Sequence, residues 1–177
     1  MAQAEYIPEY SIQDYLLWEG DWELWNGIPV SMSPSPNFRH QKIGSRILVA
    51  IQAQLTPVPC SNGCVAVYEM DWHVNDHTVV RPDIMIVCKE PEGDFVDESP
   101  ALVAEVLSPS TRTKDLTSKK DLYASSGVKY YLIFDPAENQ AQVLELSDTT
   151  YRGIPTDSEL ELDEDCRISL NVEDVFR

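Results

Sequence analysis

The stretch from Pro100 to Gly127, PALVAEVLSPSTRTKDLTSKKDLYASSG, begins as a buried strand and ends as a helix. The letters ALVA and VL on either side of Glu105 are typical of a core strand, and Gly127 is a typical stop for the helix. An isolated carboxylate in such a strand would cost several kcal/mol unless a charged group compensated it. The stretch therefore predicts a sheet covered by a helix, and a charged partner for Glu105.

A second acid, Asp83, lies in the apolar segment VVRPDIMIVC, residues 79–88. Two carboxylates on neighbouring strands repel each other unless a proton or a cation lies between them. A divalent cation removes both penalties, and a few hard oxygen ligands with room for water and phosphate oxygens suit magnesium or manganese. We therefore expect Asp83 and Glu105 to be the ligands of a Mg²⁺ or Mn²⁺ ion.

Lys119 is the lysine that the sequence places nearest to these two acids. On a helix over 114–126 it shares one arc with Leu116 and Leu122, so it is predicted to face the sheet. A buried ammonium group needs an anionic partner, and an acidic metal site with a bound phosphate would provide one. The alternative is that the side chain extends to solvent or pairs with Asp115, four residues earlier.

Two other polar residues are weaker candidates for the same site. His40 lies at the centre of the apolar arc of a helix predicted over 36–55. A histidine there is most often a core residue, and otherwise a phosphate contact or a proton donor. Glu23, next to two tryptophans in DWELWNG, is a further acid near the site. His73 and His77 lie around a predicted turn, which favours solvent-exposed side chains for both.

The remaining patterns predict one mixed sheet with helices against its faces, an α/β or α+β fold. Ser11 and Gly20 are a typical cap and stop for a short N-terminal helix. Asn26 and Gly27 are typical of the tight turn of a hairpin that follows. Further strands are predicted at 63–74, 78–88, 101–107, 129–136 and 141–146, with weaker alternation at 159–163 and 166–170.

The length of 177 residues fits a single domain over 1–177 that can bury its own core. No stretch reaches the roughly 18 apolar residues of a membrane span, and the N-terminal residues lack a basic, apolar leader, so a cytoplasmic protein is expected. Cys60, Cys64, Cys88 and Cys166 are then expected to be free thiols. The segment CSNGC offers two zinc ligands, but structural zinc sites usually need four well-spaced ligands.

The formal net charge of −17 argues against a protein that coats nucleic acid without specificity, because affinity for phosphates comes from Lys and Arg. Acid dominates the runs KEPEGDFVDES and TDSELELDEDC, which are typical of solvated surface. Basic residues are concentrated in two other segments. The candidates for contacts with a nucleic-acid backbone are Arg39, Lys42 and Arg46 on the helix over 36–55, then Arg112 and Lys114 after the strand of Glu105.

These motifs resemble a known family. The order Pro82-Asp83, Glu105 on the next strand and then a lysine is similar to the signature of the PD-(D/E)xK restriction-endonuclease-like superfamily. More narrowly, RPDIMIVC, the stretch that begins at Pro100, and the early WELWNGIP and SPNFRHQKIGSRI look like the Uma-two family of bacterial endonucleases. The similarity covers most of residues 10–146 in consistent order.

The resemblance implies a restriction-endonuclease-like core and metal-dependent hydrolysis of phosphodiester bonds in nucleic acid, with DNA as the expected substrate. It assigns Asp83 and Glu105 to the metal ion, Mg²⁺ or Mn²⁺, and Lys119 to catalysis. It gives lesser roles to Glu23 and His40. A homodimer is compatible with it, because nucleases of this fold often act as dimers.

One position departs from the superfamily's basic pattern, in which a lysine lies two residues after the glutamate. Here that position is Leu107, so Lys119 from the following helix is the expected substitute. The rival hypothesis is a non-catalytic interaction or regulatory module that keeps the fold, and Leu107 and the negative charge favour it. A third hypothesis is a globular domain in which Glu105 is protonated or paired with Arg81.

Overall fold

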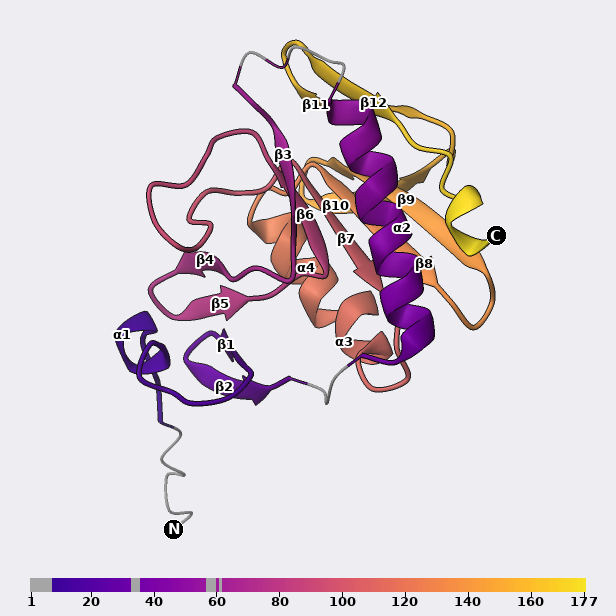
Figure 1. Cartoon of the computed structure of the whole chain (residues 1–177). Helices are drawn as coiled ribbons and strands as arrows, with labels where there is room; N and C mark the ends of the chain where they lie inside the picture. The colour runs from indigo at the N-terminus through magenta and orange to yellow at the C-terminus, as the bar shows by residue number, and fades with distance from the viewer. Residues whose placement is uncertain (1–7, 33–35, 57–59, 61) are drawn as a thin grey trace.

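The computed structural model describes residues 8–32, 36–56, 60 and 62–177, and its centre is a six-stranded mixed sheet. Its strands follow the order β10-β9-β8-β7-β6-β3; β7 and β8 are parallel, and the other neighbours are antiparallel. The predicted mixed sheet flanked by helices is therefore confirmed (Figure 1). The strands are β3 (Val65–Tyr68), β6 (Ile84–Val87), β7 (Leu102–Val106), β8 (Tyr130–Asp135), β9 (Gln140–Ser147) and β10 (Thr150–Ile154).

A smaller sheet of four short strands, in the order β2-β1-β5-β4, lies beside the central sheet. The hairpin predicted at Asn26 and Gly27 is present, and both residues have the positive φ, 48° and 78°, that a tight two-residue turn requires. The four strands are β1 (Trp22–Trp25), β2 (Ile28–Ser31), β4 (Trp72–Asn75) and β5 (Thr78–Val80).

The N-terminal helix α1 (Ile12–Tyr15) is shorter than predicted. Ser11 caps it as expected, but the N–H groups of Leu17 and Trp18 donate to carbonyls three residues earlier, which tightens the chain into a turn. This turn brings the Trp18 ring against the Tyr15 ring, with centroids 5.5 Å apart. The helix therefore ends before Gly20, the stop that the sequence predicted.

The strands predicted over 63–74 and 78–88 are each divided between the two sheets. The first breaks at Glu69, whose φ is 47°, and the second breaks at Arg81 and Pro82. Pro82 has no N–H to give to a ladder, which favours a break at that point. The two breaks open a space between the sheets, and Glu69, Arg81 and Asp83 line it.

Helix α2 (Phe38–Leu55) forms as predicted and begins after Asn37, whose side chain accepts the N–H of His40. The helix predicted over 114–126 is instead two helices, α3 (Arg112–Leu116) and α4 (Ser118–Ser125). The break is at Thr117, where φ is −126° and ψ is −90°, outside the helical region. The two short helices lie on the opposite face of the sheet from α2 (Figure 1).

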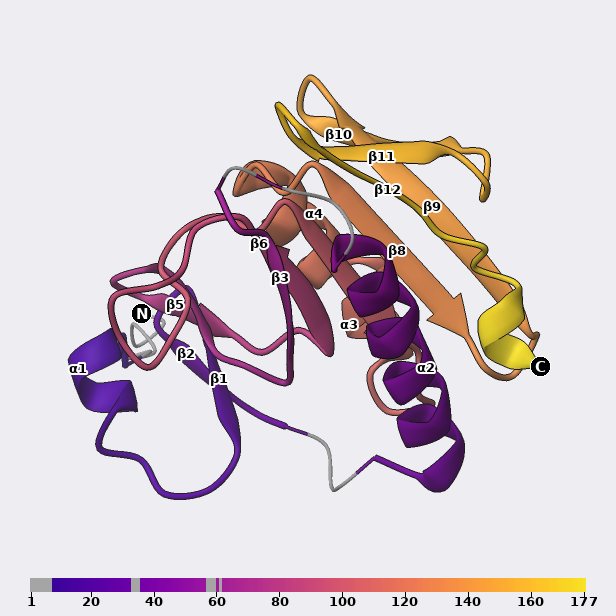
Figure 2. The ribbon, with the colours of Figure 1, turned by 45° about the horizontal axis from the view of Figure 1, so that its top comes forward.

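The core has one layer on each face of the central sheet. Ile43, Ile47 and Ile51 of α2 pack on one face together with the hairpin β11 (Glu159–Asp163) and β12 (Cys166–Ser169) and the short 3₁₀ helix η1 (Asp174–Phe176). Figure 2 shows this hairpin beside α2. Tyr123 of α4 packs on the other face. Each fully buried apolar side chain of this size contributes about 1.5–3 kcal/mol.

Two sequence-based expectations about side chains are wrong. The cysteines are not free thiols, because Cys60 is bonded to Cys166 and Cys64 to Cys88. His73 is buried in β4 rather than exposed, and its ring stacks on that of Phe95 with centroids 3.6 Å apart. The other histidine near this turn, His77, has a half-exposed side chain. In the described part of the chain, no helix is long and apolar enough to cross a membrane.

Candidate active site

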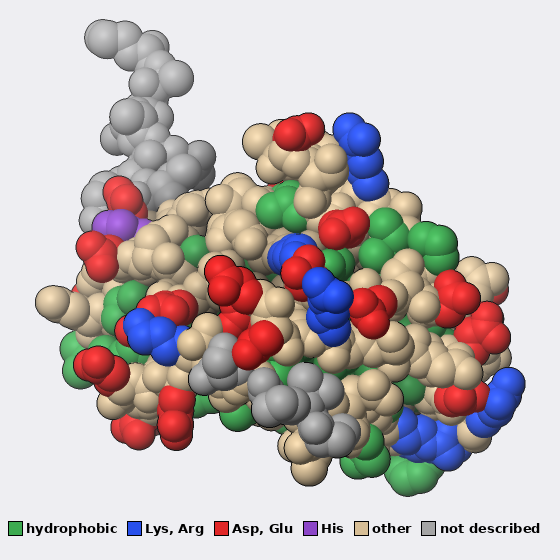
Figure 3. All heavy atoms as spheres, turned by 90° about the horizontal axis from the view of Figure 1, so that it is seen from above, with side chains coloured by type: hydrophobic (Ala, Val, Ile, Leu, Met, Phe, Trp, Pro, Cys, Tyr) green, Lys and Arg blue, Asp and Glu red, His purple; other side chains and the backbone are tan. Residues whose placement is uncertain are grey.

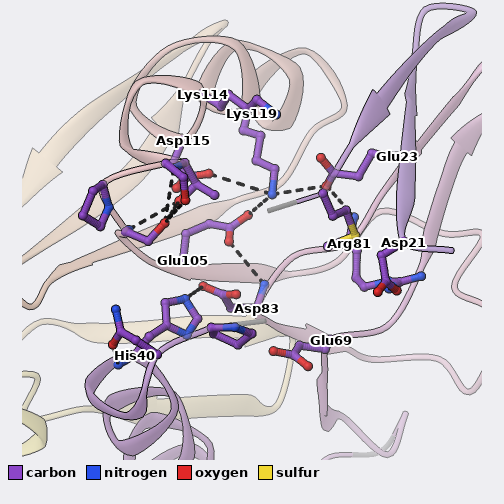
Figure 4. A pocket seen from close by; sticks show the side chains of 17 residues that line it. Asp21, Glu23, His40, Glu69, Arg81, Asp83, Glu105, Lys114, Asp115 and Lys119 are labelled. Atoms are coloured by element: carbon purple, nitrogen blue, oxygen red, sulfur yellow. Dashed lines mark hydrogen bonds and ion pairs between the residues drawn. The ribbon is translucent and has the colours of Figure 1, made fainter. Parts of the chain in front are cut away.

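A pocket of about 510 Å³ opens at the breaks between the two sheets, beside the first turn of α2 and the α3–α4 segment (Figure 4). Each of these elements contributes a polar side chain that points into it. The structure therefore brings together in one pocket all five residues that were predicted to be catalytic: Glu23, His40, Asp83, Glu105 and Lys119.

Asp83 and Glu105 lie opposite each other where β6 begins and β7 ends. The last pair in the register joins Ile84 to Ala104, and the two acids are the next residues outward. The Asp83 N–H donates to Glu105 Oε2 at 3.3 Å, and the Val106 N–H donates to Asp83 Oδ2 at 2.7 Å. Backbone groups of the two strands thus hold both carboxylates at one edge of the pocket.

Lys119 is the charged partner of Glu105. Its Nζ donates to Glu105 Oε1 at 3.0 Å and lies 3.3 Å from Glu23 Oε1. The hydroxyl of Tyr123 donates to the same Glu105 oxygen at 2.6 Å. The alternative pairing with Asp115 also occurs, at 3.9 Å, so the lysine lies among three carboxylates.

The pKa values of this pair are shifted in the same direction for different reasons. Burial raises the pKa of Glu105 well above its usual range; the charge of Lys119 opposes this shift, and the charge of Asp83 adds to it. Burial alone would lower the pKa of Lys119. The charges of Glu105, Glu23 and Asp115 outweigh burial and raise it well above its usual range. The lysine is therefore held as a cation, positioned to compensate negative charge.

Glu23 is fixed from both sides. Its Oε1 accepts the backbone N–H of Arg81 at 2.9 Å, and its Oε2 accepts the indole N–H of Trp25 at 3.2 Å. The Arg81 guanidinium is 2.7 Å from Asp71 and 3.0 Å from Asp21. The sequence alone left open whether Glu105 pairs with Arg81. In the structure the Arg81 side chain pairs with Asp71 and Asp21 instead.

His40 approaches the two acids from α2. Its Nε2 is 3.2 Å from Asp83 Oδ2, and the ring is buried. Burial would lower the pKa of His40, but the hydrogen bond and the charge of Asp83 outweigh it and raise the pKa. Among the described residues, its Nδ1 has no hydrogen-bond partner. Asp83 therefore holds the ring in place beside the pocket.

Two residues of this constellation, Asp115 and Tyr123, were not predicted to belong to the site. Asp115 is buried, and its Oδ1 has no hydrogen-bond partner in the described part of the chain. Burial raises the pKa of Asp115, against the effect of Lys119. The signal that could have found both is the spacing of four residues on either side of Lys119. The break at Thr117 changes the direction of α3 and is not evident from that spacing.

The predicted nucleic-acid contacts are spread over a wider area than the pocket. Lys114 lines it, with Nζ 5.7 Å from the centroid of the Trp25 ring. Arg112 pairs with Asp135 at 2.6 Å. The other three lie on α2 outside the pocket lining: Arg39 donates to the Asn139 side chain, Arg46 donates to the Val175 carbonyl, and Lys42 is exposed.

The donor set at Asp83 and Glu105 fits a hard divalent cation. Among the described residues, both side-chain contacts of Asp83 engage Oδ2, which leaves Oδ1 for a ligand. In the part of the chain that the structure describes, Glu105 Oε2 accepts only the long backbone hydrogen bond from Asp83. Mg²⁺ and Mn²⁺ commonly take one or two carboxylates and complete their shell with waters and phosphate oxygens, for which the pocket has room.

Comparisons with known proteins bear on the fold and the family of the chain. A solved structure described as a putative nuclease belonging to DUF820, from Anabaena variabilis ATCC 29413, is 19% identical in sequence. It superposes with a TM-score of 0.70 over 94% of this chain and 97% of the other, which shows a shared fold. No curated protein matches the chain. The family model Uma2, described as a putative restriction endonuclease, matches residues 12–173, and the chain therefore belongs to the Uma2 family.

Proposed function

We propose that the chain is a nuclease that hydrolyses phosphodiester bonds in DNA with the help of Mg²⁺ or Mn²⁺ held by Asp83 and Glu105. The family supports a nuclease acting on nucleic acid. The observation that carries the proposal is the burial of Lys119 between Glu105 and Glu23, with Asp83 opposite Glu105 on the facing strand. A buried cation at the edge of a polar pocket is an arrangement suited to stabilising a charged transition state.

Each side chain has a separate task in this mechanism. A bound divalent cation would lower the pKa of a coordinated water and neutralise charge on the phosphate oxygens. Lys119 is fixed by Glu105 and Glu23, so its ammonium group can orient the attacking water and compensate the negative charge that develops on the phosphate. His40, held by Asp83, can contact the phosphate or donate a proton to the leaving oxygen.

The position of Leu107 does not exclude this mechanism. Leu107 is buried in the apolar cluster that includes Tyr123 and Val103, so no charge reaches the site from that position. Lys119 comes from the next helix and places its Nζ 3.0 Å from Glu105. The lysine of the basic superfamily pattern is thereby replaced in space, although not in sequence.

A cleavage assay with matched lysine variants tests the proposal. Purified protein is incubated with single-stranded and double-stranded DNA in the presence of Mg²⁺ or Mn²⁺. We expect Asp83→Asn to abolish cleavage and Lys119→Ala to reduce it by roughly 10²-fold or more, as loss of one electrostatic stabiliser commonly does. Lys120→Ala, on the same helix but outside the pocket lining, is the control and should cost little.

Two results would contradict the proposal. The first is that the wild-type protein shows no metal-dependent cleavage of either substrate. The second is that the Lys119 and Lys120 variants cleave at the same rate. Either result would make a non-catalytic module that keeps the fold the better hypothesis.

A further inference from the structure

The four cysteines come from four separate places in the chain and lie in one region of the fold. Cys60 follows α2, Cys64 precedes β3, Cys88 follows β6 and Cys166 begins β12. The Sγ atoms of Cys60, Cys64 and Cys166 all lie within 4.8 Å of one another, and Cys88 is bonded to Cys64. This cluster lies beyond the end of α2 opposite to His40.

The distance from the candidate active site follows from the length of α2. His40 lies in the first turn of this 18-residue helix, and Cys60 lies beyond its last turn. At 1.5 Å per residue the helix is about 27 Å long. The cysteine cluster is therefore a second site and takes no part in the pocket of Asp83 and Glu105.

The backbone brings the cysteines together before any sulfur chemistry is considered. Strands β3 and β6 pair Val65 with Val87, so Cys64 and Cys88 are the next opposite residues, with Cα atoms 3.8 Å apart. The Cα atoms of Cys60 and Cys166 are 4.8 Å apart. Sheet pairing and the packing of α2 against β12 thus set the positions of the four side chains.

We propose that these four cysteines, when reduced, form a tetrathiolate Zn²⁺ site. Four thiolates are one of the usual ligand sets of structural zinc, and the spacing of Cys60 and Cys64 falls in the usual range for a pair of zinc ligands. With Zn–S bonds of about 2.3 Å, the sulfur atoms of a tetrahedral site are about 3.8 Å apart. The three Sγ atoms that lie within 4.8 Å of one another need only small rotations to reach this arrangement.

The disulfide state and the zinc state are related by a balanced reaction. Each of the two disulfides takes up two electrons from a thiol or phosphine reductant and two protons from solution, and the pair yields four thiols. Binding of one Zn²⁺ then replaces the protons on the four sulfur atoms. In a reducing compartment the zinc form is the expected one. Thiol–disulfide exchange with two equivalents of a small-molecule disulfide, which is reduced to four thiols, would release the ion and restore the two protein disulfides.

The surroundings give access to the cluster from one side. Cys88 is half-buried and lines a cavity of about 490 Å³, together with Asn62, Lys89 and Asp163. Cys64 and Cys166 are buried, so a reductant or a metal ion would reach the cluster through Cys88 or the half-buried Cys60. An entry path beside a buried set of ligands is what a metal site requires.

The cluster ties the C-terminal hairpin to the rest of the fold. Cys166 begins β12, and its bond to Cys60 spans 106 residues of sequence. Zinc bound by all four cysteines would make the same connection between the hairpin, α2 and the central sheet. Reduced protein without metal would lack it, so the hairpin should become more open to hydrogen exchange.

Titration of the reduced protein with a spectroscopic metal tests the proposal. The full chain is reduced with a phosphine, freed of reductant, and titrated with Co²⁺. We expect one equivalent to produce the intense visible bands of tetrahedral, thiolate-bound Co²⁺, and one equivalent of Zn²⁺ to remove them. Cys166→Ser should lose these bands, whereas a variant that carries both Asp83→Asn and Glu105→Gln should keep them.

Alkylation of the wild-type protein gives a second readout that needs no variant. Iodoacetamide should modify all four reduced thiols, and one equivalent of Zn²⁺ should slow this reaction about tenfold or more, because bound thiolates are poor nucleophiles. If Cys166→Ser fails to fold, Cys88→Ser replaces it in the titration, since Cys88 is half-buried. Alkylation at the same rate with and without Zn²⁺, or wild-type Co²⁺ bands identical to those of the serine variant, would overturn the proposal.

Discussion

At the scale of single residues, Glu105 shows how a carboxylate is kept inside a core strand. It is 2% exposed, and Lys119, Tyr123 and the Asp83 N–H all donate to it. The lysine compensates for its charge, but Glu23 and Asp115 surround the same lysine. The acidic side chains therefore outnumber the single buried cation, and a proton or a second cation would offset this excess.

The dependence of stability on Lys119 can be measured without any substrate. Lys119→Met keeps the aliphatic volume but leaves the buried carboxylates unpaired. In metal-free protein we expect it to lower the free energy of unfolding by about 3–5 kcal/mol, the usual effect of removing one partner of a buried ion pair. Urea denaturation at neutral pH gives the number. Lys120→Met, outside the pocket lining, is the matched control and should change stability little.

A double variant shows whether Glu105 is the partner responsible. Adding Glu105→Gln to Lys119→Met removes one of the unpaired charges, so it should recover part of the lost stability and give a coupling energy of about 1–3 kcal/mol. Additive effects of the two substitutions would mean that the 3.0 Å contact carries no interaction energy.

At the scale of elements, the first turn of α2 connects helix stability to the site. Asn37 accepts the backbone N–H of His40, so one side chain both caps the helix and holds the histidine's backbone. Asn37→Ala should lower the free energy of unfolding by about 1 kcal/mol, the usual cost of losing such a cap. Asn37→Ser is the control, because serine caps nearly as well.

Thermal or urea unfolding of the two variants separates capping from other effects. Equal stability of Asn37→Ala and Asn37→Ser would show that the hydrogen bond to the His40 N–H does not hold the helix end. The same samples can be assayed for cleavage, since a frayed first turn would move His40 away from Asp83.

Much of the site follows from patterns within single elements. Asp83 and Glu105 were predicted to face each other because each lies in an apolar strand, and Lys119 was predicted to face the sheet because of its helical arc. The pairing of Lys119 with Asp115 was foreseen only as an alternative to the site, whereas the structure has Lys119 contact Asp115, Glu105 and Glu23 together. The break at Thr117 was not foreseen, because the residues on either side of it follow one continuous helical pattern. Pairing of cysteines far apart in sequence, such as Cys60 with Cys166, depends on the packing of the hairpin and is not encoded locally.

At the scale of the whole molecule, a chain with a net charge of −17 must bind a polyanion through local contacts. Figure 3 shows acidic side chains scattered over one face, with a few lysines and arginines between them. The long-range field of such a surface opposes nucleic acid, and salt screens this repulsion as well as the attraction of each basic contact. A comparison of variants with equal charge change is therefore needed to identify a contact.

Lys114 is the predicted contact best placed to hold a phosphate backbone, since it lines the pocket and lies over Trp25. Lys114→Gln should weaken DNA binding and reduce the slope of log affinity against log salt by up to about one unit, measured by fluorescence anisotropy with Ca²⁺ in place of Mg²⁺. Arg152→Gln, an exposed change of the same charge on β10, controls for the net field and should leave the slope unchanged.

Replacement of Arg39, Lys42 and Arg46 together tests the exposed side of α2 in the same way. If Lys114→Gln and Arg152→Gln have equal slopes, Lys114 is not a phosphate contact. A lower slope in the triple variant alone would place the DNA along α2 rather than over the pocket mouth.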